Sequence, residues 1–333
     1  MRIATYNCQW FDHLFDDHAR LWNDEGRGGR EGVTRAEQTQ GLGHVFRALD
    51  ADAILVVEAP DARHRARDGT PALEVFAKVM GLRTREVLMG FHSNSQQEIA
   101  LLYDPAVLTV RHDPQGGDPP RFDGTYRVGF NGNPPDPIIW SKPPLEIEAL
   151  TTKGSVLRLI GVHAKSKAPH GARNEAQAAR IALENRRKQL AQCVWLRARV
   201  DRHLAARDPL IVLGDFNDGP GLDDQEEVFG RSGVEIVMGE KGAVHLYDPH
   251  ARLALCGPTA ASPTTARFRV PPDGRWLSAL LDYVMVSPDL RARKPAWRIW
   301  HPFDDPECWA DEALRRALLH ASDHFPVTLD IDL

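Results

Sequence analysis

The chain has 333 residues, of which 42% are hydrophobic and 26% are charged, and its formal net charge is -5. This composition is typical of a soluble globular protein with a core of good size. The negative charge argues against a protein that coats DNA indiscriminately, although a local basic groove on an acidic molecule stays compatible with it.

Other bulk features exclude further classes of protein. No window of about 18 apolar residues exists, so we expect no membrane span. Met1 leads directly into the first predicted strand without a secretory leader, which predicts a cytoplasmic protein. The cysteines include no CxxC pair, which favours reduced thiols over a zinc site or disulfides. These cysteines are Cys8, Cys193, Cys256 and Cys308.

The first part of the chain alternates between strands and helices. Residues 3–7 are predicted to form a short strand, and the polar, glycine-rich stretch 12–35 is predicted to be a surface loop. Thr34 has the sequence context of an N-cap for a helix at 35–49, where apolar residues recur at helical spacing. The continuous apolar run 53–57 is typical of a strand buried on both faces.

The same alternation continues to the end of the chain. Residues 112–137 are dense in Pro and Gly, which predicts an irregular insertion inside one catalytic domain that spans 1–333. The longest predicted helix covers 174–206, and Lys153-Gly154 predicts a hairpin turn. The remaining predictions are a helix at 72–80 and strands at 99–103, 145–151, 156–163, 210–213, 280–286 and 327–331.

Polar residues occupy the ends of the predicted strands. One such residue is usually a turn residue or a helix cap, but this many, all suited to one chemistry, are hard to assign to turns alone. Strand ends in α/β proteins are also where ligand sites gather. The residues that follow or precede strands in this way are Asn7, Glu58, His163, Asp215, Asn217, Asp282, Asp323 and His324.

The residue types suit metal-assisted hydrolysis of a phosphoester. Mg²⁺ prefers oxygen ligands and keeps several waters, so Glu58 and Asn7 are sufficient protein ligands for it. An Asp can orient and deprotonate the attacking water. His and Asn side chains stabilise the negative charge of the transition state, and a carboxylate partner holds a His in one tautomer.

At these residues the sequence resembles the endonuclease/exonuclease/phosphatase superfamily, and in particular its deoxyribonuclease-like and sphingomyelinase-like members. The order of the motifs is the family's order, and a GDFN followed about a hundred residues later by SDH is a specific pair. The matching stretches are TYNCQWF, ILVVEAP, IGVHAKSK, IVLGDFND, LLDYVMVS and ASDHFPV.

The resemblance implies a four-layered α/β sandwich, with two mixed β-sheets face to face and helices outside. It implies Mg²⁺ or Mn²⁺ as the cofactor, with Glu58 as its principal ligand and Asn7 and Asp323 helping directly or through water. Asp215 would orient or deprotonate the attacking water, and Asn217 would contact a phosphate oxygen. His324 would contact the phosphate and be held in place by its carboxylate partner. That partner would be Asp282.

The resemblance also gives His163 the role of a transition-state donor or acid. Apurinic endonucleases lack this His, which argues against an enzyme dedicated to abasic sites. Lys142, in the stretch WSKPPLE, stands where an Arg is frequent in the bacterial nucleases of the family. The segment that precedes strand 99–103 resembles the one that supports His163, with Gln97 and Glu98 as the alternatives for the supporting residue.

Basic and aromatic residues near the motifs have two readings each. We expect Lys165 and Lys167 to bind the substrate's phosphates, whereas Arg173 and Arg180 suit a solvated loop and helix face. Trp10 and Phe11 suit either stacking on a base or packing at the rim. The tryptophans expected in the core or at the rim are Trp276, Trp297, Trp300 and Trp309.

The main functional prediction is a monomeric phosphodiesterase that hydrolyses nucleic acid by in-line attack of water. The alternative within enzymes is a phosphatase or phosphodiesterase for a small-molecule or lipid head-group phosphoester, because the fold hosts both. A catalytically inactive homologue that only binds a partner is the rival from another class. The complete set of site residues argues against this last reading.

Overall fold

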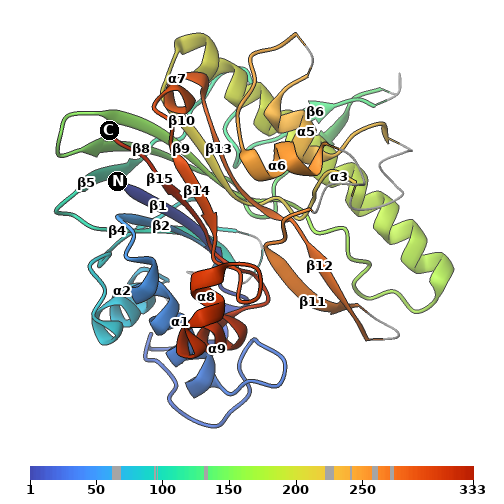
Figure 1. Ribbon diagram of the computed structural model, residues 1–333. Coiled ribbons are helices and arrows are strands. Elements are labelled where there is room, and N and C mark those ends of the chain that lie inside the picture. Colours follow the sequence, from blue (N-terminus) through green and yellow to red (C-terminus); the bar gives the residue numbers. More distant parts are fainter. Residues whose placement is uncertain are drawn as a thin grey trace.

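The structure is a computed structural model that describes residues 1–61, 69–93, 95, 97–130, 134–221, 229–240, 242–256, 262–270 and 274–333. Within these residues two large mixed β-sheets pack face to face, and helices cover their outer faces (Figure 1). The predicted four-layered α/β sandwich is therefore confirmed.

The first sheet has six strands in the order β14-β15-β1-β2-β4-β3. β1 and β2 run parallel, whereas β15 and β4 are antiparallel to their neighbours in the sheet, which makes it mixed. Its strands are β1 (Arg2–Asn7), β2 (Ala53–Ala59), β3 (Glu86–Met89), β4 (Glu98–Tyr103), β14 (Ala296–Ile299) and β15 (Val327–Asp330).

The second sheet has five strands in the order β13-β10-β9-β8-β5. β9 and β10 run parallel, and the other neighbours are antiparallel. The Lys153-Gly154 hairpin joins β8 to β9 as predicted, with Gly154 at a φ of 87°. The strands are β5 (Leu108–His112), β8 (Leu145–Thr151), β9 (Val156–His163), β10 (Leu210–Asp215) and β13 (Asp282–Val286).

Apolar side chains from both sheets fill the space between them. Leu55 of β2 packs in one cluster with Leu157 of β9 and Leu213 of β10. Its neighbours Ile54 and Val56 belong to a separate cluster that the helices cover. Successive side chains of a strand point to opposite faces, so an uninterrupted apolar run such as 53–57 is what a strand buried on both sides requires.

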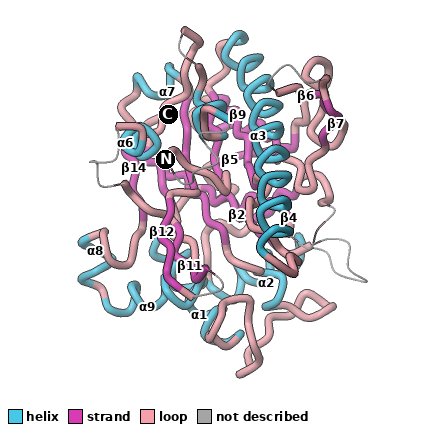
Figure 2. Tube along the Cα trace, turned by 90° about the vertical axis from the view of Figure 1, so that its right-hand side faces the viewer, coloured by secondary structure: helices cyan, strands magenta, loops and turns pink. Residues whose placement is uncertain are grey.

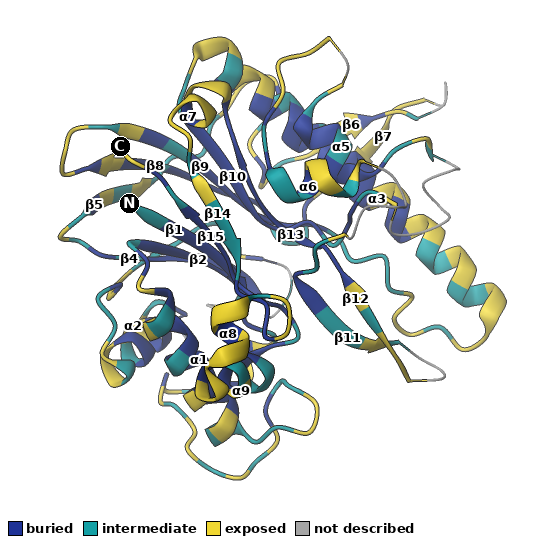
Figure 3. Cartoon of the chain, viewed as in Figure 1, coloured by how far each residue is buried: buried dark blue, intermediate teal, exposed yellow. Residues whose placement is uncertain are grey.

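Helices cover each outer face, as Figure 2 shows for the long helix α3 and Figure 3 shows by the burial of their inner sides. Thr34 caps α1 as predicted, in a capping box with Glu37, and Asn174 caps α3. The first sheet is covered by α1 (Arg35–Leu49), α2 (Gly69–Met80), α8 (Pro306–Ala310) and α9 (Glu312–Ala321), and the second by α3 (Glu175–Ala206), α5 (Gly233–Met238) and α6 (Pro249–Ala254). A short helix, α7 (Pro288–Ala292), follows β13.

Two small hairpins lie outside the main sheets. β11 (Ala266–Val270) and β12 (Arg275–Ala279) form an arm that projects from the body (Figure 1). β6 (Tyr126–Val128) pairs with β7 (Asp136–Ile138), so the prediction that 112–137 is entirely irregular was wrong; 131–133 lie outside the described residues. Tyr126 stacks on a buried Trp of α3, and this long-range contact gives the insertion its local order.

The stretch 12–35 was predicted as a surface loop, and its first residues contradict that prediction. The 3-10 helix η1 (Phe11–Leu14) places Leu14 in the core cluster beneath the first sheet, and Phe15 joins it. These few apolar residues follow no helix or strand period, so the sequence pattern could not distinguish them from a polar loop.

None of the helices in the described ranges combines the length and the apolar run that a membrane crossing needs. The four cysteines are all free thiols in the structure.

Candidate active site

The strand register aligns three of the predicted site residues across the second sheet. Asp215 at the end of β10 pairs with His163 of the parallel strand β9. On its other side, Asp215 pairs with Asp282 of β13. In the first sheet, Asn7 ends β1 opposite Val57 of β2. The side-chain amide of Asn7 lies 3.1 Å from the carboxylate of Asp215, so both sheets deliver polar side chains to the same edge of the sandwich.

The glycine before Asp215 is required by the backbone of β10. Gly214 has a φ of 135°, and a Cβ there would lie 2.1 Å from the carbonyl oxygen of Val162 on β9. Only glycine fits so close to the neighbouring strand. The GD pair of the motif GDFN therefore places the carboxylate of Asp215 at the end of the strand.

Glu58 leaves the regular course of β2. Its φ is 61°, in the left-handed region, and the pairing of β2 with β4 shifts register between Val57 and Ala59. The carboxylate Oε2 of Glu58 accepts the backbone N–H of Trp10 at 2.8 Å. Burial raises the pKa of Glu58, and the ammonium of Lys142 works against that rise. A buried carboxylate held in this way is well suited to a cation.

Asp215 is the buried centre of the site. Its Oδ2 accepts hydrogen bonds from the side-chain amides of Asn7 at 3.1 Å and Asn217 at 3.0 Å, and its Oδ1 accepts the backbone N–H of Asn217 at 2.7 Å. Burial raises the pKa of Asp215 to about 7, and Asp282 adds to the rise while His324 opposes it. A carboxylate with such a pKa is matched to a general base at neutral pH.

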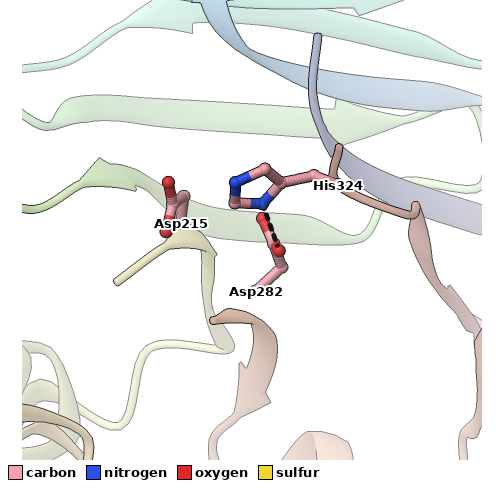
Figure 4. A group of neighbouring side chains, drawn as sticks. All are labelled: Asp215, Asp282 and His324. Carbon is pink, nitrogen blue, oxygen red and sulfur yellow. Dashed lines mark hydrogen bonds and ion pairs between the residues drawn. The ribbon is translucent and has the colours of Figure 1, made fainter. Parts of the chain in front are cut away.

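His324 and Asp282 form a buried pair. The Nδ1 of His324 lies 2.7 Å from the Oδ2 of Asp282, and Figure 4 shows the ring between Asp282 and Asp215. Potential ligand atoms of the three residues lie within 4.8 Å of one another. Burial alone would lower the pKa of His324, but the charges of Asp282, Asp215 and Asp323 raise it well above its usual value. His324 is therefore an imidazolium.

His163 has the opposite protonation state. Burial lowers its pKa well below the usual range, and Lys142 lowers it further. The Nζ of Lys142 lies 3.1 Å from the Nε2 of His163, so the ammonium donates to the lone pair of a neutral ring. A ring that accepts a hydrogen bond at Nε2 carries no proton on that nitrogen, so it cannot act as an acid through Nε2 in this state. Lys142 is the positively charged group beside His163.

The sequence reasoning missed two supporting residues. The side-chain oxygen of Gln9 accepts the backbone N–H of Asp323 at 3.0 Å. The backbone N–H of Gln9 donates to the side-chain oxygen of Asn7 at 3.0 Å. The hydroxyl of Ser322 donates to the carbonyl of Asn7 at 2.7 Å and accepts the N–H of His324. Both residues lie inside the quoted motifs, so their spacing from Asn7 and His324 was the available signal.

Other predicted residues are engaged elsewhere. The ammonium of Lys167 lies 2.8 Å from the buried carboxylate of Asp218, so this lysine is already paired with a carboxylate of the protein. Lys165 is half-buried, and its backbone N–H donates to a glutamine of α3. The second N–H of the Asn217 amide donates to the carbonyl of Ala164 at 3.2 Å. In this structure Asn217 therefore holds Asp215 in place, and a phosphate contact would require it to exchange a partner.

Neither of the two residues expected to support His163 does so through its Nδ1 within the described residues. Its Nδ1 has no hydrogen-bond partner there, so neither Gln97 nor Glu98 contacts that atom. The carboxylate of Glu98 instead accepts the backbone N–H of Ser93.

The aromatic residues after Asn7 separate into two kinds. Phe11 is fully buried in the core, which excludes stacking on a base. Trp10 is 38% exposed and stacks on His13 with 5.1 Å between the ring centroids. The expected solvated face of α3 is present at Arg180, which is exposed and pairs with Glu184.

The chain matches the model of a known protein family. The model of the Endonuclease/Exonuclease/phosphatase family matches residues 4–324. No curated protein sequence matches the chain.

Solved structures share the fold. TDP2 from Caenorhabditis elegans is 14% identical, with a TM-score of 0.53 and coverage of 100% of this chain and 74% of that chain. The 3'-5' exonuclease NExo from Neisseria meningitidis is 16% identical, with a TM-score of 0.50 and 100% coverage of both chains. TDP2 from D. rerio, complexed with a single strand DNA product, is 13% identical, with a TM-score of 0.50 and coverage of 100% and 99%.

Proposed function

The chain belongs to the endonuclease/exonuclease/phosphatase family, and from this premise we propose that it is a divalent-metal-dependent phosphodiesterase that hydrolyses nucleic acid. The observation that carries the proposal is the convergence of two carboxylates and an imidazolium at one edge of the sandwich. These are Asp215, His324 and Glu58.

The donor set fits Mg²⁺ or Mn²⁺. Glu58 is a half-buried carboxylate whose pKa burial raises, and the negative charge of Asp323 raises that pKa further. Oxygen donors of this kind are those that hard divalent cations prefer. Glu58 would be the principal ligand, and Asp323 and Asn7 would contribute directly or through water. A bound cation would supply Lewis-acid polarisation of the phosphate oxygens.

The protein's own residues would carry out the remaining steps. Asp215, held by two amides, would take a proton from the attacking water. The imidazolium of His324, oriented by Asp282, would bind a phosphate oxygen as negative charge develops there. Lys142 and the neutral His163 would approach the phosphate from the opposite side. The two cationic donors, His324 and Lys142, are already in place and need no reorganisation during the reaction.

Two observations support nucleic acid as the substrate class. Proteins that share the fold include an exonuclease and a TDP2 complexed with a single strand DNA product. Basic side chains also gather around the site despite the negative net charge. Lys142 and the half-buried Lys165 lie beside His163, and their charges depress its pKa. A diester flanked by further phosphates suits such surroundings.

The test is an activity screen of the purified protein with added Mg²⁺ or Mn²⁺. It compares single-stranded DNA, duplex DNA, RNA, bis-p-nitrophenyl phosphate and p-nitrophenyl phosphate. We expect diesters to be hydrolysed faster than the monoester. Preference for the monoester would favour the small-molecule phosphatase, and no hydrolysis at all would favour the inactive homologue.

The control for this screen is Asp215→Asn, which keeps the shape of the side chain. Because Asp215 acts on the proton of the attacking water, kcat should fall by roughly a hundredfold or more with KM nearly unchanged. A raised KM with unchanged kcat would assign Asp215 to binding instead.

A further inference from the structure

A cavity of about 460 Å³ opens beside the candidate metal ligand Asp323. Its volume lies within the range of pockets that hold small ligands. One wall comes from the loop that precedes α1, and the other comes from the β11–β12 arm. The lining residues that matter here are Gln9, Arg30, Phe268, Arg269, Trp276 and Asp323.

The wall formed by the arm combines an indole with cations. Trp276 lies opposite Arg269 in the register of β11 and β12, and its side chain is 49% exposed. The guanidinium of Arg269 lies 5.2 Å from the centre of the indole, and that of Arg267 lies 5.1 Å from it. Such contacts hold the half-exposed ring in one orientation. The arm therefore presents a positioned flat ring and two positive charges.

The facing wall is tied to the active site by hydrogen bonds. The guanidinium of Arg30 donates to the carbonyl of Leu319 at 3.2 Å and to the side-chain oxygen of Gln9 at 3.5 Å. That same oxygen accepts the backbone N–H of Asp323. A group bound against Arg30 is therefore only one residue away from the candidate metal ligand.

The charges of the cavity favour an anion once the site holds a cation. Arg30 and Arg269 line it together with two acids, Glu31 and Asp323. A cation on Asp323 would neutralise one of these acids and leave the cavity positive. Anionic groups next to flat rings are the chemistry that arginine and tryptophan recognise together.

We propose that this cavity binds the nucleoside of the substrate next to the phosphate that is cleaved, with its base on Trp276 and a neighbouring phosphate between Arg30 and Arg269. The assignment rests on the proposed function, because it presumes hydrolysis at the adjacent site. Stacking on an indole requires a flat ring, which an inositol head group does not have, and the positive charge of a choline head group would be repelled by Arg267 and Arg269 at the indole. The cavity therefore favours nucleotides over lipid head groups.

The test uses three chromogenic diesters that release the same p-nitrophenolate. Thymidine 5'-(p-nitrophenyl phosphate) and thymidine 3'-(p-nitrophenyl phosphate) carry a nucleoside on the retained side, whereas methyl p-nitrophenyl phosphate carries none. For Trp276→Ala we expect KM to rise roughly tenfold or more on at least one of the thymidine esters. On the methyl ester its kcat/KM should equal that of the unchanged protein.

Two further variants make the comparison specific. Trp276→Phe keeps a flat ring and should recover most of the lost affinity for the thymidine ester. Trp309→Ala removes another exposed tryptophan, 54% exposed and in contact with Arg315, that does not line the cavity. It should leave all three substrates unaffected.

The outcomes separate this inference from the proposed function. If the unchanged protein cleaves all three diesters and Trp276→Ala weakens none of them, or weakens the methyl ester equally, the cavity is not a nucleoside subsite and the phosphodiesterase stands. If the unchanged protein cleaves none of the three diesters, the proposed function fails and this inference with it.

Discussion

At the scale of single residues, the two histidines of the site show how partners decide a charge that burial alone would remove. Both rings are buried, and burial lowers the pKa of each. His324 faces the carboxylates of Asp282 and Asp215, which reverse the effect. His163 faces the ammonium of Lys142, which reinforces it. One site therefore holds an imidazolium and a neutral imidazole.

Lys142 gives the enzyme a testable pH limit. Burial lowers its pKa to about 8, against the charges of Glu58 and Asp215 that raise it, and Lys165 lowers it further. The ammonium is present below that pH and is lost above it. If the ammonium contacts the phosphate, kcat/KM measured on a diester should fall as the pH rises through about 8.

The matched variant for this prediction is Lys142→Arg. A guanidinium stays charged throughout the accessible range, so the fall in kcat/KM should move to a higher pH. For Lys142→Met we expect kcat/KM at neutral pH to fall about a hundredfold, which is comparable to the effect of removing one preorganised donor. An unchanged alkaline limb in Lys142→Arg would show that another group sets it.

At the scale of elements, α3 is joined to the active-site loop by a buried ion pair. The carboxylate of Asp218, three residues after Asp215, accepts hydrogen bonds from Arg186 of α3 and from the backbone N–H of Gly233, the first residue of α5. The side chains of Arg186 and Asp218 are both fully buried. The loop that carries Asp215 and Asn217 is thus fixed by two helices behind it.

Removing this arginine should be costly. Arg186→Met would leave the carboxylate of Asp218 buried without its main counter-charge, so unfolding in urea should show a loss of about 3–5 kcal/mol. Arg187→Met is the control, because the Arg187 side chain is 47% exposed and pairs with Asp136 at the surface. It should change stability by less than about 1 kcal/mol. Equal effects of the two variants would contradict a structural role for the buried pair.

At the scale of the whole molecule, the candidate metal site exists only because two sheets meet. Glu58 and Asn7 come from the first sheet, and the proposed base Asp215 comes from the second. The side-chain amide of Asn7 bridges them, 3.4 Å from Glu58 and 3.1 Å from Asp215. A cation bound here should therefore stabilise the entire fold.

Metal binding should be visible as thermal stabilisation. Burial raises the pKa of Glu58, so the folded protein holds its proton more tightly than the unfolded chain does. The ionised carboxylate consequently lowers stability at neutral pH without metal. Added Mg²⁺ should raise the Tm, with about 2.7 kcal/mol of stabilisation at a hundred times its Kd. EDTA should reverse the shift and abolish activity.

Glu58→Gln separates these effects. Its Tm without metal should equal or exceed that of the unchanged protein, because a buried charge is gone, but Mg²⁺ should no longer raise it. Glu184→Gln alters an exposed acid on α3 and should keep the full metal response. A normal Mg²⁺ shift in Glu58→Gln would place the cation on other residues, and the cluster of Asp215, Asp282 and His324 would be the first alternative.

Much of this molecule could be predicted from local patterns. The apolar run 53–57 marked a strand buried on both faces, and Thr34 marked the start of a helix. Gly214 before Asp215 and the pair Asp323-His324 marked where polar side chains would gather. These features depend on residues a few positions apart, and backbone periodicity and capping act over that range.

Other features were decided only by the tertiary structure. Lys142 precedes His163 by 21 positions, Gln9 connects to Asp323 across nearly the whole chain, and Lys167 is drawn to Asp218. The strands and the polar residues at their ends could be predicted because each is encoded within one element, and the order of these motifs along the chain implied the sandwich fold. The sequence by itself could not determine contacts between distant loops or the resulting charges of buried groups, since both depend on which side chains the packed sheets bring together.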